Sequence, residues 1–358
     1  MTATVAETRV PPWHRRPELV GVGMVLVLGL GAVALAAGWV PDALEPIVAG
    51  LLLALVIGVI VVAITGSGDV RRKLAPYGLL QPGFLWLSLF FLAPLWVLFV
   101  MSLSTKESRF DPSPTFSWDF SNYTEAFTDF RPQFSRGFGY AAAATVLCIV
   151  IGYPMAYVIA FRGGRWKNLL LGMVVVPFFT SYLIRTLAWQ TLLADEGPIV
   201  GVFDATGFSS VLEFLGVMDN GRLLNTPWAV IGGLTYNFLP FMLLPIYVSL
   251  EKIDLRLVDA AKDLYSTAGR AFRKVVLPLS LPGVFAGSLL TFIPAAGDFV
   301  NAQFLGGPNT YMIGNSIQNQ FLVQNDYPLA AAMAFVLMFI ITVAVVIYTR
   351  VLGTEDIA

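Results

Sequence analysis

The chain has 358 residues, of which 57% are hydrophobic and only 13% are charged, and its formal net charge is −1. A composition this apolar excludes a soluble globular fold of this length. The charges are segregated among separate loops, so the net charge itself indicates no partner, and we expect no nucleic acid ligand.

A bilayer span needs about 20 predominantly apolar residues, and about eight such stretches follow one another along the chain. In order they are Leu19 to Val40, Ile47 to Gly66, Leu80 to Leu103, Phe138 to Phe161, Asn168 to Ala194, Pro227 to Leu250, Leu277 to Ile293 and Leu329 to Leu352. We therefore predict an all-α polytopic membrane protein with about eight transmembrane helices.

Basic residues cluster in alternate loops between these stretches. The clusters occupy residues 14–16, 71–73, 162–167 and 252–274, and Arg350 follows the last stretch. The other loops are mainly acidic or lack basic residues, except for 104–136, which is mixed in sign. By the positive-inside rule, both termini are predicted to be cytoplasmic.

The first apolar stretch has a second possible interpretation. Arg15 and Arg16 precede an apolar core that ends near Ala37, which is also the layout of a secretory signal peptide. The length of the stretch and the full span directly after it favour a retained helix. Residues 1–78 are thus predicted to form an amino-terminal extension with two transmembrane helices, and residues 79–358 a core with six.

Several function classes lack the residues they need. Cys148 is the only cysteine and His14 the only histidine. Disulfides and cysteine-ligated metals are excluded, and the usual nucleophile sets are missing, so we expect no catalytic residue and no metal site. A secondary transporter would need acidic residues in the middle of its helices, and none occur there. A non-catalytic membrane scaffold remains open.

The charged segment 251–278 carries an ordered pattern. It contains Asp259-Ala260-Ala261, then Phe272 and Val275, then Leu277-Pro278. This order resembles the cytoplasmic coupling loop of ABC importer permeases. Tyr265 stands where that family has a glycine able to turn with positive φ, and Gly269 is the residue that could replace it.

This resemblance implies the other parts of an importer. The loop would dock in a groove of an ATPase, with the alanines allowing close approach and Phe272 as apolar anchor. The chain lacks the Gly-x-x-x-x-Gly-Lys-Ser/Thr pattern that cradles nucleotide phosphates, so ATP and magnesium would bind partner subunits. The implied partners are an ATPase dimer, a second permease, expected to be a C-type homologue, and an extracytoplasmic binding protein. The membrane would be the bacterial cytoplasmic membrane.

Motifs in the second half narrow the resemblance. They are found at 293–300, 305–308, 312–315, 317–321 and 326–329, with further motifs at 122–127 and 177–189. Together they resemble the B-type permease of spermidine/putrescine ABC transporters, which implies a polyamine substrate. Permeases for iron, phosphonates and other small solutes share part of the pattern and remain alternatives.

Polar and aromatic residues near membrane depth are candidates for the substrate pathway, because a carboxylate and aromatic rings suit an ammonium ligand. These candidates are Tyr182, Trp189, Tyr236, Asn237, Asp298 and Phe299. The alternative is that the aromatic residues form interfacial belts and Asn237 bonds a neighbouring helix. Arg185, inside an apolar stretch, is expected to pair with Asp195, with Asp298 or with backbone carbonyls.

Overall fold

The computed structural model describes residue 83 and residues 86–106, 114–263 and 267–351. Two compact units, Met1–Met101 and Ser102–Ala358, are each described by themselves. The first unit contains the π-helix η2 (Ser88–Leu92) and most of α4 (Ala93–Ser102). The spans predicted at Leu19 to Val40 and Ile47 to Gly66 lie outside the described residues, as does the proposed extension 1–78.

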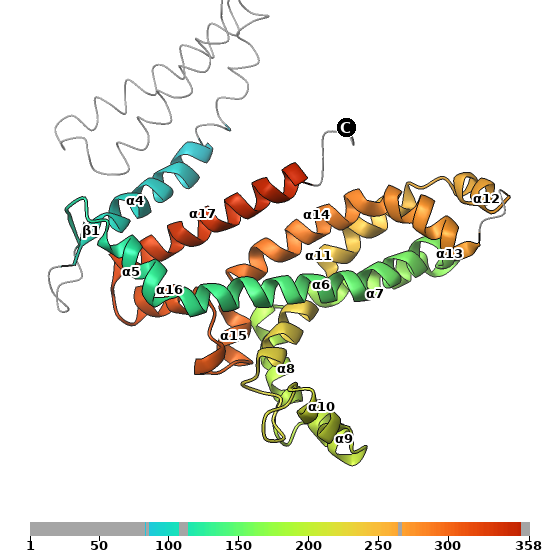
Figure 1. The fold of residues 1–358 in the computed structure, drawn as a ribbon, viewed down its shortest axis with the longest axis horizontal. Coiled ribbons are helices and arrows are strands. Elements are labelled where there is room, and N and C mark those ends of the chain that lie inside the picture. Colours follow the sequence, from blue (N-terminus) through green and yellow to red (C-terminus); the bar gives the residue numbers. More distant parts are fainter. Residues whose placement is uncertain (1–82, 84–85, 107–113, 264–266, 352–358) are drawn as a thin grey trace, which may run out of the picture. The chain divides into compact units, whose positions relative to one another are not determined.

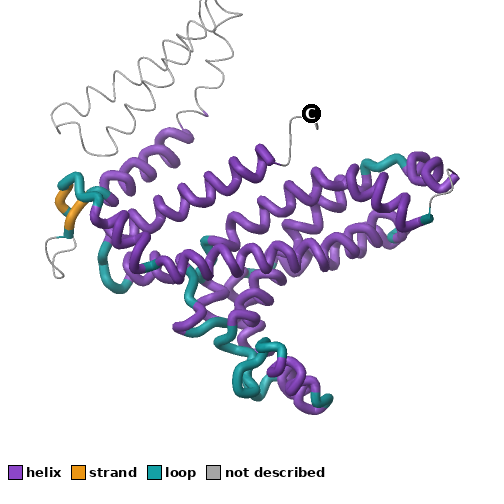
Figure 2. The backbone as a smooth tube through the Cα atoms, in the orientation of Figure 1, coloured by secondary structure: helices purple, strands orange, loops and turns teal. Residues whose placement is uncertain are grey.

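Helices dominate the described part of the second unit (Figure 2). The longer ones are α5 (Ser121–Asp129), α6 (Arg131–Arg162), α7 (Lys167–Val175), α8 (Tyr182–Leu193), α9 (Pro198–Ala205), α10 (Phe208–Phe214), α11 (Pro227–Glu251), α12 (Leu255–Asp263), α14 (Leu277–Ala296), α16 (Ile313–Leu322) and α17 (Tyr327–Val351). Short turns are η3 (Gly164–Trp166), η4 (Val176–Phe179), α13 (Ala268–Ala271), the π-helix η5 (Phe272–Val276), α15 (Val300–Phe304) and η6 (Pro308–Thr310). Strands β1 (Ser104–Thr105) and β2 (Thr115–Phe116) pair antiparallel, with Ser104 opposite Phe116.

The predicted all-α fold is confirmed, and four predicted spans are found. Within the described residues, four helices are long and apolar enough to cross a membrane: Arg131–Arg162, Pro227–Glu251, Ala268–Ala296 and Tyr327–Arg350. They contain the described residues of the spans predicted to begin at Phe138, Pro227, Leu277 and Leu329. From the span predicted at Leu80 to Leu103, a shorter apolar helix, Ser88–Ser102, is described.

The span predicted from Asn168 to Ala194 is not one straight helix. The helical segments Gly164–Phe179 and Tyr182–Ala205 meet at a bend of 95°. Thr180 and Ser181 adopt extended backbone there, with ψ angles of 154° and 132°. Consequently α8, α9 and α10 project away from α6, α11 and α14 (Figure 1).

Different loops lie at the two ends of the bundle formed by α6, α11 and α14. At one end Lys167 pairs with Glu251 at 2.7 Å, which brings the basic loops 162–167 and 252–274 together. At the other end Lys106 donates to the backbone oxygen of Gln324 at 2.8 Å. This grouping agrees with the alternation of loop charges along the sequence.

Small residues bring α6, α11 and α14 into close contact. On α6, buried small residues recur every three or four positions, at Gly137, Ala141, Ala144, Cys148, Gly152 and Ala156. On α14, a Cβ added to Gly283 would lie 2.5 Å from the carbonyl oxygen of Pro245 on α11. Backbone-to-backbone packing through small residues is the usual way that membrane helices associate, because lipid supplies no hydrophobic force between them.

The π-helical turns each end two residues before a proline, Pro94 or Pro278. The amide of Leu277 donates to the oxygen of Phe272, five residues back. This wider turn accommodates the missing N–H of Pro278 and the bulk of its ring. The α-helix α14 begins at Leu277-Pro278, as the predicted span does, and the continuous apolar helix extends back through η5 and α13 to Ala268.

Candidate functional site: a charged loop and a buried polar cluster

The predicted coupling segment, residues 251–278, begins with the short helix α12. Asp254 caps α12, because its carboxylate accepts the amide of Arg256 at 2.9 Å. Asp259 and Ala260 are exposed on α12, and Ala261 is half-buried. The helix thus presents both charge and a small side chain to its surroundings.

The turn after α12 differs from the expectation for Gly269. This glycine lies within α13 and has no positive φ, so it does not supply the left-handed turn expected of it. Tyr265 lies outside the described residues. Leu277 is half-buried and Pro278 exposed at the start of α14.

Phe272 points into its own bundle. Its ring makes edge-to-face contacts with Tyr153 and Tyr157 of α6, with centroid distances of 5.8 Å in both cases. It packs against the buried cluster that contains Ile246 and Leu250. The side chain expected to anchor a partner protein instead anchors the coupling segment to α6.

The second candidate region is a buried polar cluster, defined by Tyr182, Thr186, Asn237, Asp298 and Asn301. Asp298 follows the end of α14 and is 8% exposed. Its carboxylate accepts hydrogen bonds from the Tyr182 hydroxyl, from the Asn301 amide at 2.8 Å and from the Asn301 side chain at 3.3 Å. Asp298 lies just past the apolar span. Its burial raises the pKa of its carboxyl above the ordinary value, although these hydrogen bonds act in the opposite direction.

Asn301 joins the cluster to two further helices. Its side-chain nitrogen also donates to the Tyr182 hydroxyl at 2.5 Å, on α8. Its side-chain oxygen accepts from Asn237 of α11 at 3.1 Å. Asn237 also donates to Thr186 at 3.4 Å, while its own side-chain oxygen has no hydrogen-bond partner in the part of the chain that the structure describes. The cluster therefore connects α8, α11 and α15.

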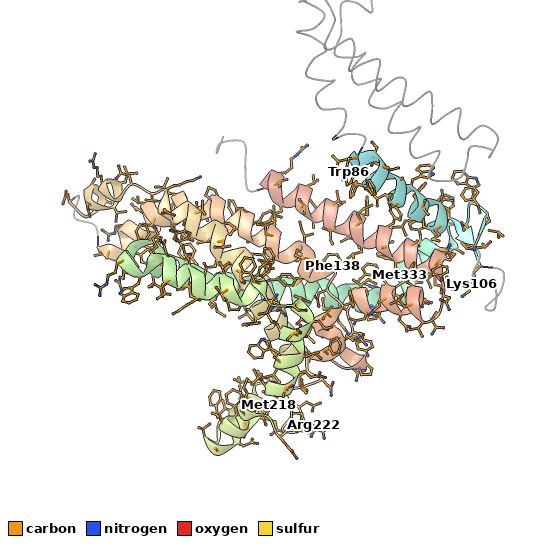
Figure 3. All side chains as sticks on the ribbon, turned by 180° about the vertical axis from the view of Figure 1, so that it is seen from behind. Trp86, Lys106, Phe138, Met218, Arg222 and Met333 are labelled. Carbon is orange, nitrogen blue, oxygen red and sulfur yellow. The ribbon has the colours of Figure 1, made fainter. Side chains whose placement is uncertain are left out.

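Arg185 does not form the carboxylate pair expected of it. Asp195 is bound by Arg222 instead, with 3.0 Å between Nε and Oδ2, in the neighbourhood of α9 and α10 where Figure 3 labels Arg222. Arg185 is buried, and its Nε has no hydrogen-bond partner among the described residues. The guanidinium carbon lies 5.4 Å from the ring centre of Phe178 and 5.7 Å from that of Tyr182.

Three of the aromatic candidates, Trp189, Tyr236 and Phe299, do not belong to the polar cluster. Trp189 and Tyr236 contact each other edge to face at 5.2 Å, and Tyr236 and Phe299 are exposed. The structure brings Tyr182, Asn237 and Asp298 together, whereas Trp189, Tyr236 and Phe299 make none of the cluster's hydrogen bonds described above.

Further rings lead from the cluster toward a groove. Tyr182 contacts Phe238 at 6.2 Å, and Phe238 contacts Phe241 at 6.1 Å. Phe241 lines a groove of about 830 Å³ between α11 and α14 that reaches Leu257 of α12. Its other lining residues include Pro245, Val248, Lys252 and Pro282. The cluster and the coupling segment are thus linked by one continuous face of α11.

Sequence reasoning missed Asn301, Thr186 and Phe178. Asn301 could have been found, because an acidic residue three positions before a helical amide is a common helix-start pattern. Phe178 and Thr186 carry no such signal in the sequence. Only the fold brings Phe178 to Arg185 and Thr186 to Asn237. Among the described residues, no three His, Cys, Asp or Glu side chains could together hold a metal ion.

Comparison with known proteins gives one family and several relatives. Residues 148–352 match the family model described as "Binding-protein-dependent transport system inner membrane component". The spermidine/putrescine transport system permease protein PotB of Haemophilus influenzae is 36% identical over 270 residues, covering 75% of this chain and 90% of that protein. PotB of Escherichia coli is 34% identical over 267 residues, covering 74% and 93%. The inner membrane ABC transporter permease protein YdcU of Escherichia coli is 34% identical over 226 residues, covering 60% and 70%.

A solved structure shares the fold. It is a chain of a bacterial ABC transporter involved in the import of alginate, with a TM-score of 0.55 and 17% identity. The match covers 79% of this chain and 96% of the other. A second structure of a bacterial alginate ABC transporter, in complex with a periplasmic protein that carries an alginate pentasaccharide, matches with the same TM-score and identity.

Proposed function

Because this chain belongs to the family of binding-protein-dependent transport system inner membrane components, we propose that it is a permease subunit of an ATP-driven importer of polyamines such as spermidine and putrescine. The observation that carries this proposal is the 36% identity to a spermidine/putrescine permease across 90% of that protein's length. The family match over residues 148–352 includes both the coupling segment and the polar cluster.

The chemistry of the cluster supports a cationic substrate. A polyamine carries several ammonium groups, and desolvating them requires compensation by carboxylates or aromatic faces. Asp298 and the ring of Tyr182 offer both in one place. The exposed rings of Tyr236 and Phe299 offer further faces on the way to it.

From the cluster, the substrate would pass Phe238 and Phe241 and enter the groove between α11 and α14. Lys252 at that groove would discourage a cation from staying there, which favours release. This chain would therefore line the part of the substrate route that runs from the polar cluster to the groove beside α12. The second permease, a C-type homologue, would supply the opposite wall.

Energy would come from partner subunits. The 358-residue sequence holds no phosphate-binding loop, so an ATPase dimer would bind ATP and magnesium, and this chain itself would be neither an enzyme nor a cofactor carrier. Exposed Asp259 and Ala260 on α12 would enter a groove of one ATPase subunit. Closure of the two ATPases would then rock the two permeases as rigid bodies.

The surroundings follow from the same proposal. The chain would sit in the bacterial cytoplasmic membrane, with both termini in the cytoplasm, and an extracytoplasmic binding protein would deliver the substrate. The loops at 162–167 and 252–274 would then face the ATPase, on the side that carries the excess of basic residues.

The test is uptake into proteoliposomes that contain this chain, the ATPase, the second permease and the binding protein. Labelled spermidine, putrescine, ferric iron and a phosphonate are compared with ATP present or absent. The proposal expects ATP-dependent uptake of the polyamines alone. Uptake of iron or phosphonate in their place would identify a different solute, and complete failure to bind an ATPase would leave a membrane scaffold.

A further inference from the structure

Arg185 is a buried cation that has no counterion among the described residues. It is 8% exposed, and in the described part of the chain no carboxylate oxygen lies within the 4.0 Å of an ion pair from its nitrogens. Its contacts with the rings of Phe178 and Tyr182 are attractive but weaker than a desolvated ion pair. The guanidinium therefore lies where a counterion would stabilise it further.

Asp298 presents the opposite case, a buried carboxylate that no cation of the described residues contacts. It accepts three hydrogen bonds, and all three donors are uncharged groups of Tyr182 and Asn301. Such bonds solvate the carboxylate but do not neutralise it. Nothing charged within the described residues lies at ion-pair distance from it.

Tyr182 separates these two charges. One end of its side chain, the hydroxyl, binds Asp298, and its ring faces the guanidinium of Arg185. Tyr182 and Arg185 are three residues apart on α8, so they share one side of that helix. A rotation of the Tyr182 side chain would remove the one group among the described residues that contacts both charges.

We propose that Arg185 is a resident cation that competes with the substrate's ammonium group for Asp298. This inference rests on the proposed polyamine function. With substrate bound, an ammonium occupies the carboxylate and Arg185 stays on the aromatic rings. After the ammonium leaves, Tyr182 moves aside and Arg185 pairs with Asp298, which lowers the affinity of the emptied site and disfavours rebinding.

The decisive measurement is spermidine binding to the detergent-solubilised full transporter without its binding protein. Arg185→Gln removes the competing charge and should tighten binding by about tenfold, the effect of losing one charge-assisted interaction. Arg185→Lys keeps the charge and should bind like the parent. Arg222→Gln is the matched control, because Arg222 is exposed and pairs with Asp195 away from the cluster.

Tyr182→Phe provides a second, independent variant. It keeps the ring but removes the hydroxyl that holds Asp298, so Arg185 should reach the carboxylate more easily and spermidine should bind more weakly. This weakening should shrink when Arg185→Gln is added, because the competitor is then gone. An undiminished effect in the double variant would overturn the proposal. Where Arg185→Gln inserts poorly, spermidine binding by Tyr182→Phe alone that is as tight as in the parent would overturn it.

The outcomes distinguish this inference from the proposed function. If the parent neither binds nor transports spermidine, the polyamine assignment is wrong. If the parent transports spermidine but Arg185→Gln binds it equally or more weakly at normal membrane abundance, Arg185 is a structural residue and no competitor.

Discussion

Asn237 on α11 donates a hydrogen bond of 3.1 Å to the side-chain oxygen of Asn301 on α15, and so connects two helices beside Asp298. Asn237→Ala should leave the Asn301 oxygen buried without a donor, at a cost of about 1–3 kcal/mol in the free energy of unfolding. The melting temperature of the solubilised permease measures this effect. Asn319→Ala is the control, since Asn319 is exposed on α16, and equal melting temperatures of the two variants would contradict the expectation.

Asp298→Asn keeps the shape of the side chain and removes its charge. If a polyamine passes this residue, the loss of charged hydrogen bonding should cost about 1–3 kcal/mol, so uptake efficiency should fall by roughly fivefold to 150-fold. Uptake is compared with the parent at equal membrane abundance, with the exposed Asp204→Asn as control. Unchanged polyamine uptake would mean that Asp298 is structural or that the partner permease carries the selectivity.

Two substitutions in the coupling segment should fail in different ways. Phe272→Ala removes ring contacts with Tyr153 and Tyr157 and should lower the stability of the permease by about 2 kcal/mol.

Ala260→Arg places a bulky charge on exposed α12 and should abolish ATPase binding while the melting temperature stays unchanged. Thermal melting and co-purification with the ATPase separate the two effects. Normal ATPase binding by Ala260→Arg would remove α12 from its proposed role.

Gly283→Ala should disturb the contact between α11 and α14. The new methyl group would lie 2.5 Å from the Pro245 oxygen and 2.6 Å from the Cβ of Ser249, so the helices must separate, at about 1–3 kcal/mol. Gly232→Ala on α11 is the matched control, because a Cβ there meets nothing within 4 Å. It should be neutral or stabilise the helix by up to about 1 kcal/mol. Melting temperatures that fall equally for both would contradict close packing as the cause.

Reporter fusions test the orientation in the membrane. Fusions after Lys73, Lys167 and Lys274 should give a cytoplasmic signal, and fusions after Glu45, Asp219 and Asp326 an external one, because basic loops stay in the cytoplasm. A cytoplasmic signal after Asp219 would refute the predicted topology.

The sequence predicts the straight spans well because apolar length alone decides them. The bend at Thr180 and Ser181 escapes this reasoning, since residues on both sides are equally apolar and hydropathy carries no direction. Pro177 marks the place, yet Pro154, Pro240 and Pro245 lie inside α6 and α11 without breaking them. Proline alone therefore does not predict where a membrane helix breaks.

The site divides in the same way. Asp298 and Tyr182 are recognisable as residue types suited to a cation, but the hydrogen bond between them joins positions 116 apart in sequence. Phe272 fits the family pattern by position, and only the fold shows that its ring contacts α6. Composition and motif identify the chemistry, whereas the direction of each side chain depends on packing between distant helices.

The apolar helix that runs unbroken from Ala268 to Ala296 has a mechanical consequence. Its 29 residues give it a length of about 43 Å, with α12 of the coupling segment beside one end and Asp298 two residues beyond the other. Close packing at Gly283 and Gly287 fixes the middle of this helix against α11, so the helix would pivot there. A tilt of this beam by only about 5° would displace each end by roughly 2 Å in opposite directions, comparable to the helix shifts by which proteins switch state.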